Sequence, residues 1–465
     1  MNQSVFTSLL VFLVCAVAAP APAQPGSAEL TQDEIAGRIR DWVAPLAERR
    51  DFSGVIMVQR GEAEPTALTF GYADWVTGAP MSPQARFPAG SITGSLTAAM
   101  IRRLAAEGRI SLDDSVDRFI PELAAYDTVR IGDILAHTAG LDRNIPRGAL
   151  SDPRSDTLVA WMANQPAPAA GPHGRAYSDP GYGLLAVIIE RATNARFETL
   201  MTTEFLIPTD MQASRITRQP GGDAAEVPSG YVAGPLPLDL RAPMADQPIL
   251  GAAGLVVPVR DMLRLADAVR TRRIDLFLSD GRMAGSWQAE TIAGETVYTI
   301  QGSTPGYSAG ISILPGRDLA IAYGANIDSY ANREIRDALN AIALDQALAP
   351  ASTRPMTDGL TAGHLDAIGL YSGSPFGPVA IEPSEGGLDL VLLERDQRYY
   401  LTPTGADALN WRSLNARFSY GRDEAGRVAS IVVSPVGLIT PTAAWTLVRT
   451  DLPPLPAIEP INAGN

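Results

Sequence analysis

Residues 87–98, FPAGSITGSLTA, place a serine at the start of an apolar helical pattern. The apolar positions that follow it repeat at helical spacing: Leu96, Met100, Ile101 and Leu104. This spacing predicts a helix from Ser91 to Glu107 that ends at Gly108. The positive end of the helix dipole then lies at Ser91, where it favours an anionic form of the hydroxyl.

One turn after Ser91, at the position where a side chain on the same helix face could take its proton, the chain has Gly94. A lysine from elsewhere cannot fill this role, because all 37 residues counted as Lys+Arg are arginines. Burial can turn lysine into a proton acceptor, whereas arginine stays protonated. Glycine inside a helix costs about 1 kcal/mol relative to alanine. That cost favours a local reason for Gly94, such as room for a ligand or water, although drift in an unused site would leave the same residue.

Helix and strand patterns surround this segment on both sides. Other predicted helices cover 30–49 (capped by Thr31), 157–164, 182–192, 261–270 and 331–348. Predicted strands cover 52–59, 67–73, 309–314 and 319–325. Polar, turn-prone residues separate the members of each strand pair, so we expect antiparallel hairpins.

The composition changes after residue 348. Residues 349–357 are rich in Pro, Ser and Thr and predict a linker. Six short alternating runs follow, at 379–381, 388–393, 399–402, 418–420, 429–433 and 444–448. Runs of this kind with turns between them are typical of a small β-barrel or sandwich, and we predict a lipocalin-like barrel over 358–450. Residues 451–465 form a Pro-rich tail.

Bulk properties exclude several classes of partner. The chain has 465 residues, 46% of them hydrophobic, and a net charge of −14. Such acidity argues against nucleic acid or an anionic membrane surface as a partner. The sequence has no cluster of metal ligands, phosphate-binding glycine loop or nucleotide motif, so we predict no cofactor and no metal.

The first residues resemble an export signal. An apolar run from Val5 to Ala19 is followed by Ala21-Pro22-Ala23, a small-x-small pattern typical of signal cleavage. We therefore expect residues 1–23 to be a signal peptide and the mature chain to be periplasmic or secreted, with no transmembrane segment after cleavage. Cys15, the only cysteine, would leave with the signal.

Several spaced motifs resemble the serine β-lactamase and penicillin-binding-protein family, nearest its class C β-lactamase, esterase and D-aminopeptidase branch. The matching segments are 87–98, 104–114 (LAAEGRISLDD), 135–141 (LAHTAGL), 177–179 (YSD) with 181–185, 252–255 (AAGL) with Asp261, and 302–307 (GSTPGY). The resemblance implies an α/β (α+β) fold over 25–348, an antiparallel sheet flanked by helices with a helical insert.

The resemblance also implies roles for particular residues. Ser91 would be the nucleophile, Tyr177 would assist its deprotonation, and the N–H groups of Ser91 and Ser303, beside Gly302, would form the oxyanion hole. Asp179 stands where the family usually has Asn. Gly94 replaces the family's lysine.

The third motif departs from the family as well. It reads Ile300-Gln301-Gly302, so an apolar residue replaces the usual positive or polar group. A penicillin-like anion would lose its counter-charge there, which argues against β-lactam turnover.

The sequence leaves the replacement base open. Tyr177 alone is a poor base, since its unperturbed pKa is about 10. Arg175 could lower that pKa if it points inward, Asp179 could act as a weak base instead of capping the next helix, and His173 could reach the pocket from its glycine-rich loop. We expect His137 to pack structurally and His364 to be a surface residue.

Three functional hypotheses follow. The favoured one is a secreted protein of this fold, catalytically impaired, that binds a small molecule or peptide in the Ser91 pocket. The alternative is an active esterase or peptidase-type hydrolase that uses Ser91, Tyr177 and a non-lysine base on a neutral or cationic substrate. A structural envelope protein is the third, and the sequence does not decide whether the chain is an enzyme.

Overall fold

The computed structural model describes residues 29–450 apart from short segments. Those segments are 146–149, 151–153, 170–172, 219–225, 234–239, 242–247, 279–280, 329–330, 352–358, 385–386, 395–396, 406, 412–415 and 436–443. The predicted signal peptide and Pro-rich tail lie outside the described residues, as does most of the predicted linker. Among the helices of the described part, none is long and apolar enough to cross a membrane.

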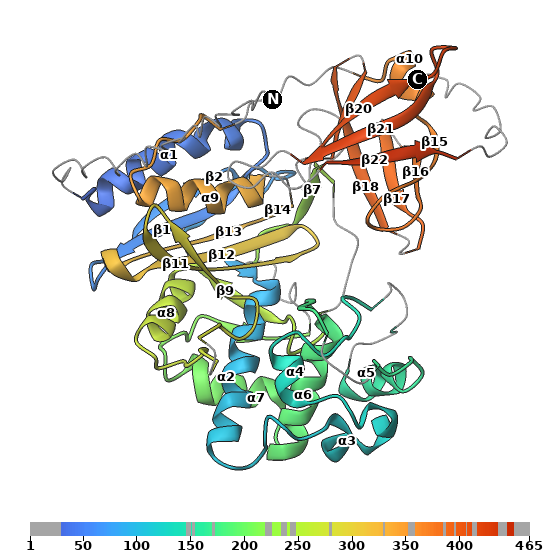
Figure 1. Cartoon of the computed structure of the whole chain (residues 1–465). Helices are drawn as coiled ribbons and strands as arrows, with labels where there is room; N and C mark the ends of the chain where they lie inside the picture. The colour runs from blue at the N-terminus through green and yellow to red at the C-terminus, as the bar shows by residue number, and fades with distance from the viewer. Residues whose placement is uncertain are drawn as a thin grey trace, which may run out of the picture.

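A six-stranded antiparallel sheet forms the centre of the larger unit (Figure 1). In spatial order its strands are β10 (Gln288–Ile292), β11 (Glu295–Thr304), β12 (Tyr307–Leu314), β13 (Leu319–Ala325), β1 (Gly54–Arg60) and β2 (Thr66–Phe70). Both predicted hairpins are present, and the turn between β12 and β13 lies at Pro315–Arg317. The two hairpins are joined by the pairing of β1 with β13, which connects the two ends of this unit of the chain.

Alternating side chains of the sheet face two different cores. One face packs against the two helices formed at the ends of this unit, α1 (Gln32–Glu48) and α9 (Ala331–Ala343), and contributes Ile321 and Tyr323 to that core. Thr31 caps α1 as predicted, in a capping box with Glu34. The opposite face contributes Ile311 and Ala322 to a larger core with the remaining helices.

The helical layer on that second face carries the serine segment (Figure 1). Its α-helices are α2 (Thr93–Ala106), α3 (Val116–Phe119), α4 (Ile131–Leu135), α5 (Ser155–Met162), α6 (Asp179–Thr193), α7 (Phe197–Met201) and α8 (Val259–Arg270). Shorter turns lie at η1 (Gly90–Ile92), η2 (Pro121–Tyr126) and η3 (Thr202–Leu206). The predicted helices at 157–164, 182–192 and 261–270 correspond to α5, α6 and α8.

Small sheets fix the loops between these layers. One contains β5 (Arg86–Pro88), β9 (Leu255–Pro258) and β6 (Arg215–Ile216). A second contains β14 (Ile327–Asp328), β7 (Tyr231–Ala233) and β8 (Leu240–Arg241), and a third contains β3 (Tyr72–Asp74) and β4 (Ala79–Pro80). The pairing of β5 with β9 leads directly into the serine turn.

The C-terminal unit is a closed eight-stranded barrel in which each strand pairs with its neighbours in sequence. Its strands are β15 (Gly369–Ser372), β16 (Val379–Ser384), β17 (Gly387–Leu392), β18 (Gln397–Gly405), β19 (Ala408–Trp411), β20 (Ala416–Arg422), β21 (Val428–Pro435) and β22 (Trp445–Arg449). The predicted barrel is confirmed, but it has eight strands where the sequence predicted six. The two missed strands, β15 and β19, are four residues each.

The expectation that His364 lies at the surface is wrong. His364 is fully buried in the short helix α10 (Ala362–Asp366), which lies at one end of the barrel (Figure 1). Its Nδ1 accepts a hydrogen bond from Thr361 N at 2.9 Å, and its Nε2 lies 3.0 Å from Ala408 O on β19. The ring therefore links the helix to the barrel wall. The domain boundaries predicted at residues 348 and 358 stay predictions.

Candidate active site

Ser91 lies in the η1 turn that leads into α2, directly beside strand β11. Two glycines allow this close approach. A Cβ on Gly302 would lie 2.0 Å from Ala89 O, and one on Gly90, whose φ is +50°, would lie 2.4 Å from Ser303 O. Both contacts are shorter than a side chain tolerates, so the strand can reach the serine turn only because these positions are glycine.

A buried threonine holds the turn in place. The hydroxyl of Thr93 donates to Gly90 O at 2.7 Å and accepts from Leu255 N on β9 at 3.0 Å. Further along α2, Ser95 Oγ accepts from Trp287 Nε1 at 2.8 Å. These hydrogen bonds join the start of α2 to the serine turn, to β9 and to Trp287, and so they fix the position of Ser91.

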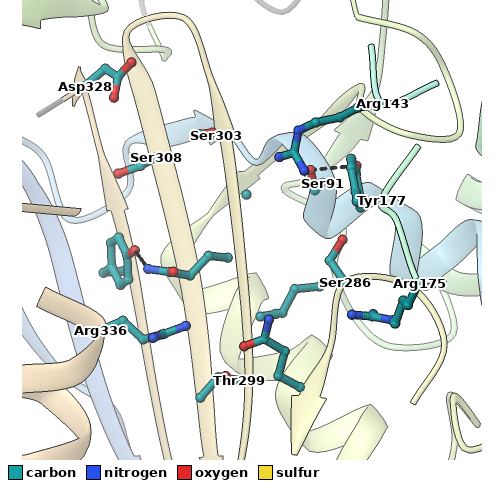
Figure 2. Close-up of a pocket in the computed structure, with 15 residues that line it drawn as sticks. Ser91, Arg143, Arg175, Tyr177, Ser286, Thr299, Ser303, Ser308, Asp328 and Arg336 are labelled. Carbon is teal, nitrogen blue, oxygen red and sulfur yellow. Dashed lines mark hydrogen bonds between the residues drawn. The ribbon is translucent and has the colours of Figure 1, made fainter. Parts of the chain in front are cut away.

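Tyr177 and Asp179 complete a hydrogen-bonded chain with Ser91. The Tyr177 hydroxyl lies 2.8 Å from Ser91 Oγ and 2.7 Å from Asp179 Oδ1 (Figure 2 draws the contact to Ser91). A phenol has one proton, and an ionised carboxylate can only accept. Tyr177 therefore donates to Asp179 and accepts from the Ser91 hydroxyl. This arrangement orients every proton of the chain from the serine towards the carboxylate.

Asp179 does not cap the helix that it begins, because another residue does. Ser178, not Asp179, is the N-cap of α6: its Oγ accepts from Gly181 N at 3.0 Å and donates to Asp142 O at 2.6 Å. The capping role considered for Asp179 is therefore wrong. Asp179 occupies the first turn instead, where the helix dipole stabilises its charged form.

The surroundings of Tyr177 keep it a neutral phenol. Burial, and next the negative charge of Asp179, raise its pKa well above the ordinary value. His137 packs against it with ring centroids 4.8 Å apart and stacks on Tyr182 at 4.7 Å. Burial lowers the pKa of His137 to about 4, helped by the charges of Arg175 and Arg143, so this imidazole is neutral at pH 7. The packing role predicted for His137 is confirmed.

Beside Gly94 lies an aromatic ring and no base. A Cβ on Gly94 would lie 3.2 Å from Cε1 of Tyr182, a tight contact that needs the ring to yield slightly. That ring is buried, and its hydroxyl donates to Leu135 O at 3.0 Å. Around Gly94, the described side chains offer no amine that could take the proton of Ser91.

A cavity of about 400 Å³ opens beside the serine. Ser91, Tyr177, Gly302 and Ser303 all line it, so the structure brings four of the five predicted site residues to one space. The fifth, Asp179, does not line the cavity but contacts the hydroxyl of Tyr177, which does. Ser303 lies on β11 with its backbone next to the Ser91 turn, the position that the oxyanion role requires.

The lining contains three arginines that the sequence analysis either missed or left undecided. Arg175 lines the cavity and donates to Gly285 O at 3.3 Å, so it does point inward. Arg143 also lines the cavity, and its guanidinium lies 5.3 Å from the centroid of the Tyr177 ring. Arg336, on α9, lines the opposite side and pairs with Asp337. Arg143 follows the LAHTAGL motif in a loop, where no periodic pattern predicts a direction for its side chain.

The third-motif strand contributes polar but uncharged groups. Ile300 is buried in the core below the sheet, while Gln301 donates to Tyr323 Oη at 2.8 Å. Among the other lining residues, burial raises the pKa of Asp328 to about 6. Position 300 supplies no cation, so the positive charge of the cavity comes from its lining arginines.

His173 is not a candidate base in this structure. Its ring packs over Gly140, and its Nε2 lies 2.8 Å from Ala169 O. It does not line the cavity. Within the described residues there is also no group of three or more His, Cys, Asp or Glu side chains that could hold a metal ion.

A serine at the start of a buried helix, a tyrosine hydroxyl on its Oγ and a glycine-bearing sheet strand beside both define a site of the serine hydrolase type. The Beta-lactamase family pattern matches residues 39–345, and the chain belongs to this family. It is 28% identical over 181 residues to "Penicillin-binding protein 4*" of Bacillus subtilis (strain 168), covering 37% of this chain and 39% of that protein. It is equally 28% identical over 181 residues to a "Beta-lactamase" of Escherichia coli (strain K12), covering 38% of this chain and 47% of that one. The matches thus span less than half the length of each of these two relatives.

Solved structures share the fold. The octameric penicillin-binding protein homologue from Pyrococcus abyssi superposes with a TM-score of 0.58 at 20% identity, covering 89% of this chain and 99% of that one. SurE gives 0.57 at 23% identity over 90% of this chain and 100% of its own. A class C beta-lactamase gives 0.57 at 20% identity over 70% of this chain and 99% of its own.

Proposed function

We propose that the chain is a serine hydrolase in which Asp179, acting through Tyr177, takes the proton of the Ser91 hydroxyl. The observation that carries this proposal is the hydrogen-bonded chain Ser91–Tyr177–Asp179, with contacts of 2.8 and 2.7 Å. It supports the hydrolase hypothesis over the impaired one, because a carboxylate can supply the proton acceptor that the absent lysine does not.

The proposed reaction is acyl transfer through Ser91. Its Oγ attacks the carbonyl carbon while its proton passes to Tyr177 and the phenol proton passes to Asp179. The N–H groups of Ser91 and Ser303 receive the oxyanion. The leaving group departs with a returned proton, and water then attacks the acyl ester in the same way, restoring the Ser91 hydroxyl.

Esters suit this site better than amides or β-lactams. A carboxylate is a weaker base than a neutral amine, so nucleophile activation is slower than in a Ser-x-x-Lys enzyme. An amide nitrogen must also be protonated as it leaves, and Tyr177, with its raised pKa, is a weak acid. We therefore propose an esterase of modest rate that does not turn over penicillins.

The test is covalent labelling combined with turnover. Intact-mass measurement after exposure to a fluorophosphonate should show one adduct, and p-nitrophenyl acetate should be hydrolysed. Both signals should vanish in Ser91→Ala and persist in Ser82→Ala, since Ser82 is an exposed serine outside the cavity. Equal hydrolysis by Ser91→Ala would refute the proposal.

A pseudo-hydrolase that only binds a small molecule or peptide remains the second candidate. The observation that favours it is the raised pKa of Tyr177. A phenol with a raised pKa gives up its proton less readily, which hinders proton transfer from Ser91 to Asp179. In that case the native protein would show neither adduct nor turnover, while Ser91→Ala would bind the same ligands as the native chain.

We also propose that residues 1–23 are removed on export and that the mature chain, with its hydrolase unit over 25–348 and barrel over 358–450, is periplasmic or secreted. The apolar run and the small-x-small site support this proposal. The mass of the mature protein recovered from cells tests it: retention of residues 1–23 would contradict it.

A further inference from the structure

We propose that Arg143 and Arg175 form an anion subsite at the mouth of the Ser91 cavity, which selects esters whose leaving group carries a carboxylate. The inference deepens the proposed hydrolase function and rests on it for the reaction, although the binding itself does not depend on turnover. It replaces the expectation of a neutral or cationic substrate, which considered only the third motif.

The charge of the cavity lining differs in sign from that of the chain. The chain as a whole carries −14. The residues that line the cavity nevertheless include three arginines and a single carboxyl group, Asp328. Burial raises the pKa of that carboxyl to about 6, so it is still mostly ionised at pH 7. Three guanidinium groups against this one lining carboxylate make the lining attractive to anions.

The three arginines of the lining differ in their partners. Arg336 already pairs with Asp337 at 2.7 Å. Arg143 and Arg175 have no acidic partner among the described residues: one faces the ring of Tyr177, and the other donates to the backbone oxygen of Gly285. Both side chains are exposed, so each guanidinium keeps donors for a ligand that arrives from solvent.

Arg143 and Arg175 lie on the side of the cavity from which the leaving group departs. Figure 2 shows Arg143 and Arg175 on the side of the cavity that carries Tyr177, across from Asp328 and Arg336. In acyl transfer, the group that removes the serine proton returns it to the leaving group. The leaving group therefore departs beside Tyr177, next to the two guanidinium groups, while the acyl portion lies on the other side.

Guanidinium groups suit this role because they bind carboxylate through paired N–H donors. Exposure limits the gain, since solvent and salt screen the attraction at the mouth of the cavity. We therefore expect a preference of about tenfold at low ionic strength, the lower end of what a charged hydrogen bond contributes.

Three esters with the same reacting bond test the proposal on the full-length protein. The first is m-carboxyphenyl acetate, with an anionic leaving group, and the second is the neutral m-carbamoylphenyl acetate. The third, mono-(m-carbamoylphenyl) succinate, carries its anion on the acyl portion. We expect kcat/KM to be about tenfold higher for the first than for the second, with no comparable gain for the third. The preference should shrink in salt.

The variant Arg143→Gln/Arg175→Gln should reduce this preference to about twofold or less. Arg417→Gln, which removes one charge from an exposed position on the barrel strand β20, should keep it. A preference that survives the double substitution, or an equal gain for the succinate ester, would overturn the proposal.

A binding measurement separates this inference from the hydrolase proposal. In the Ser91→Ala protein, calorimetry should show m-hydroxybenzoate binding about tenfold more tightly than m-hydroxybenzamide, and the double arginine substitution should abolish the difference. If neither ester is hydrolysed but this difference is found, the hydrolase proposal fails and the anion subsite stands. Equal binding of both phenols would refute the subsite.

Discussion

Replacing Asp179 by asparagine isolates the proton acceptor without disturbing its hydrogen bond. The native Asp179 Oδ1 lies 2.7 Å from the Tyr177 hydroxyl. An amide oxygen in the same place can still accept from that hydroxyl, but an amide cannot take the proton. Loss of a general base costs about 10²–10⁴-fold in rate, which corresponds to about 3–5 kcal/mol in activation free energy. We therefore expect kcat for p-nitrophenyl acetate to fall by that factor while KM changes little.

A double substitution sharpens this test. Tyr177→Phe cuts the same relay, so adding Asp179→Asn to it should cost little more. If Asp179→Asn kept kcat within about threefold of the native value, the carboxylate would not be the base and the relay argument would fail.

Tyr177→Phe alone should lower kcat by about 10²–10⁴-fold, measured by ester hydrolysis with circular dichroism as the check on folding; an unchanged rate would mean that Ser91 is activated by another group. Gly302→Ala should cost about 1–3 kcal/mol or more in unfolding free energy, because its Cβ would lie 2.0 Å from Ala89 O; urea denaturation measures this, and native stability would show that the strand can move away. The pKa of His137 is about 4 in the folded chain and about 6.5 in the unfolded chain. Below pH 6.5 the unfolded state therefore binds more protons, and the free energy of unfolding should fall by about 3 kcal/mol by pH 4. His137→Asn, which tolerates the φ of +58° found there, should flatten that part of the stability–pH curve; an equally steep fall would assign the dependence to other groups.

Periodic patterns predicted the framework well because burial imposes them. The helix after Ser91, the two hairpins and the helices that became α1 and α9 all show regular apolar spacing, and each is present. The barrel was predicted for the same reason, although its strands β15 and β19 were missed. Burial of His364 was missed, because a histidine in a short polar helix gives no sign that it will contact a strand 44 residues away.

The sequence predicted which residues belong to the site but not how hydrogen bonds connect them. Ser91, Tyr177 and Asp179 were all identified from motifs, yet the sequence did not show that Ser178 caps α6 while Asp179 contacts Tyr177. The charge of the cavity was misjudged for a similar reason. The third motif is read along one strand, whereas Arg143 reaches the cavity from a loop, whose side-chain direction follows from tertiary packing alone.

The way the barrel closes has a topological consequence. Its first strand, β15, pairs with its last, β22, and Thr450 N donates to Leu370 O at 2.9 Å just beyond that seam. The polypeptide thus enters and leaves the barrel at adjacent points, the geometry found in units that tolerate circular permutation. Joining the two ends and opening a different hairpin should accordingly preserve the pairing of the barrel strands.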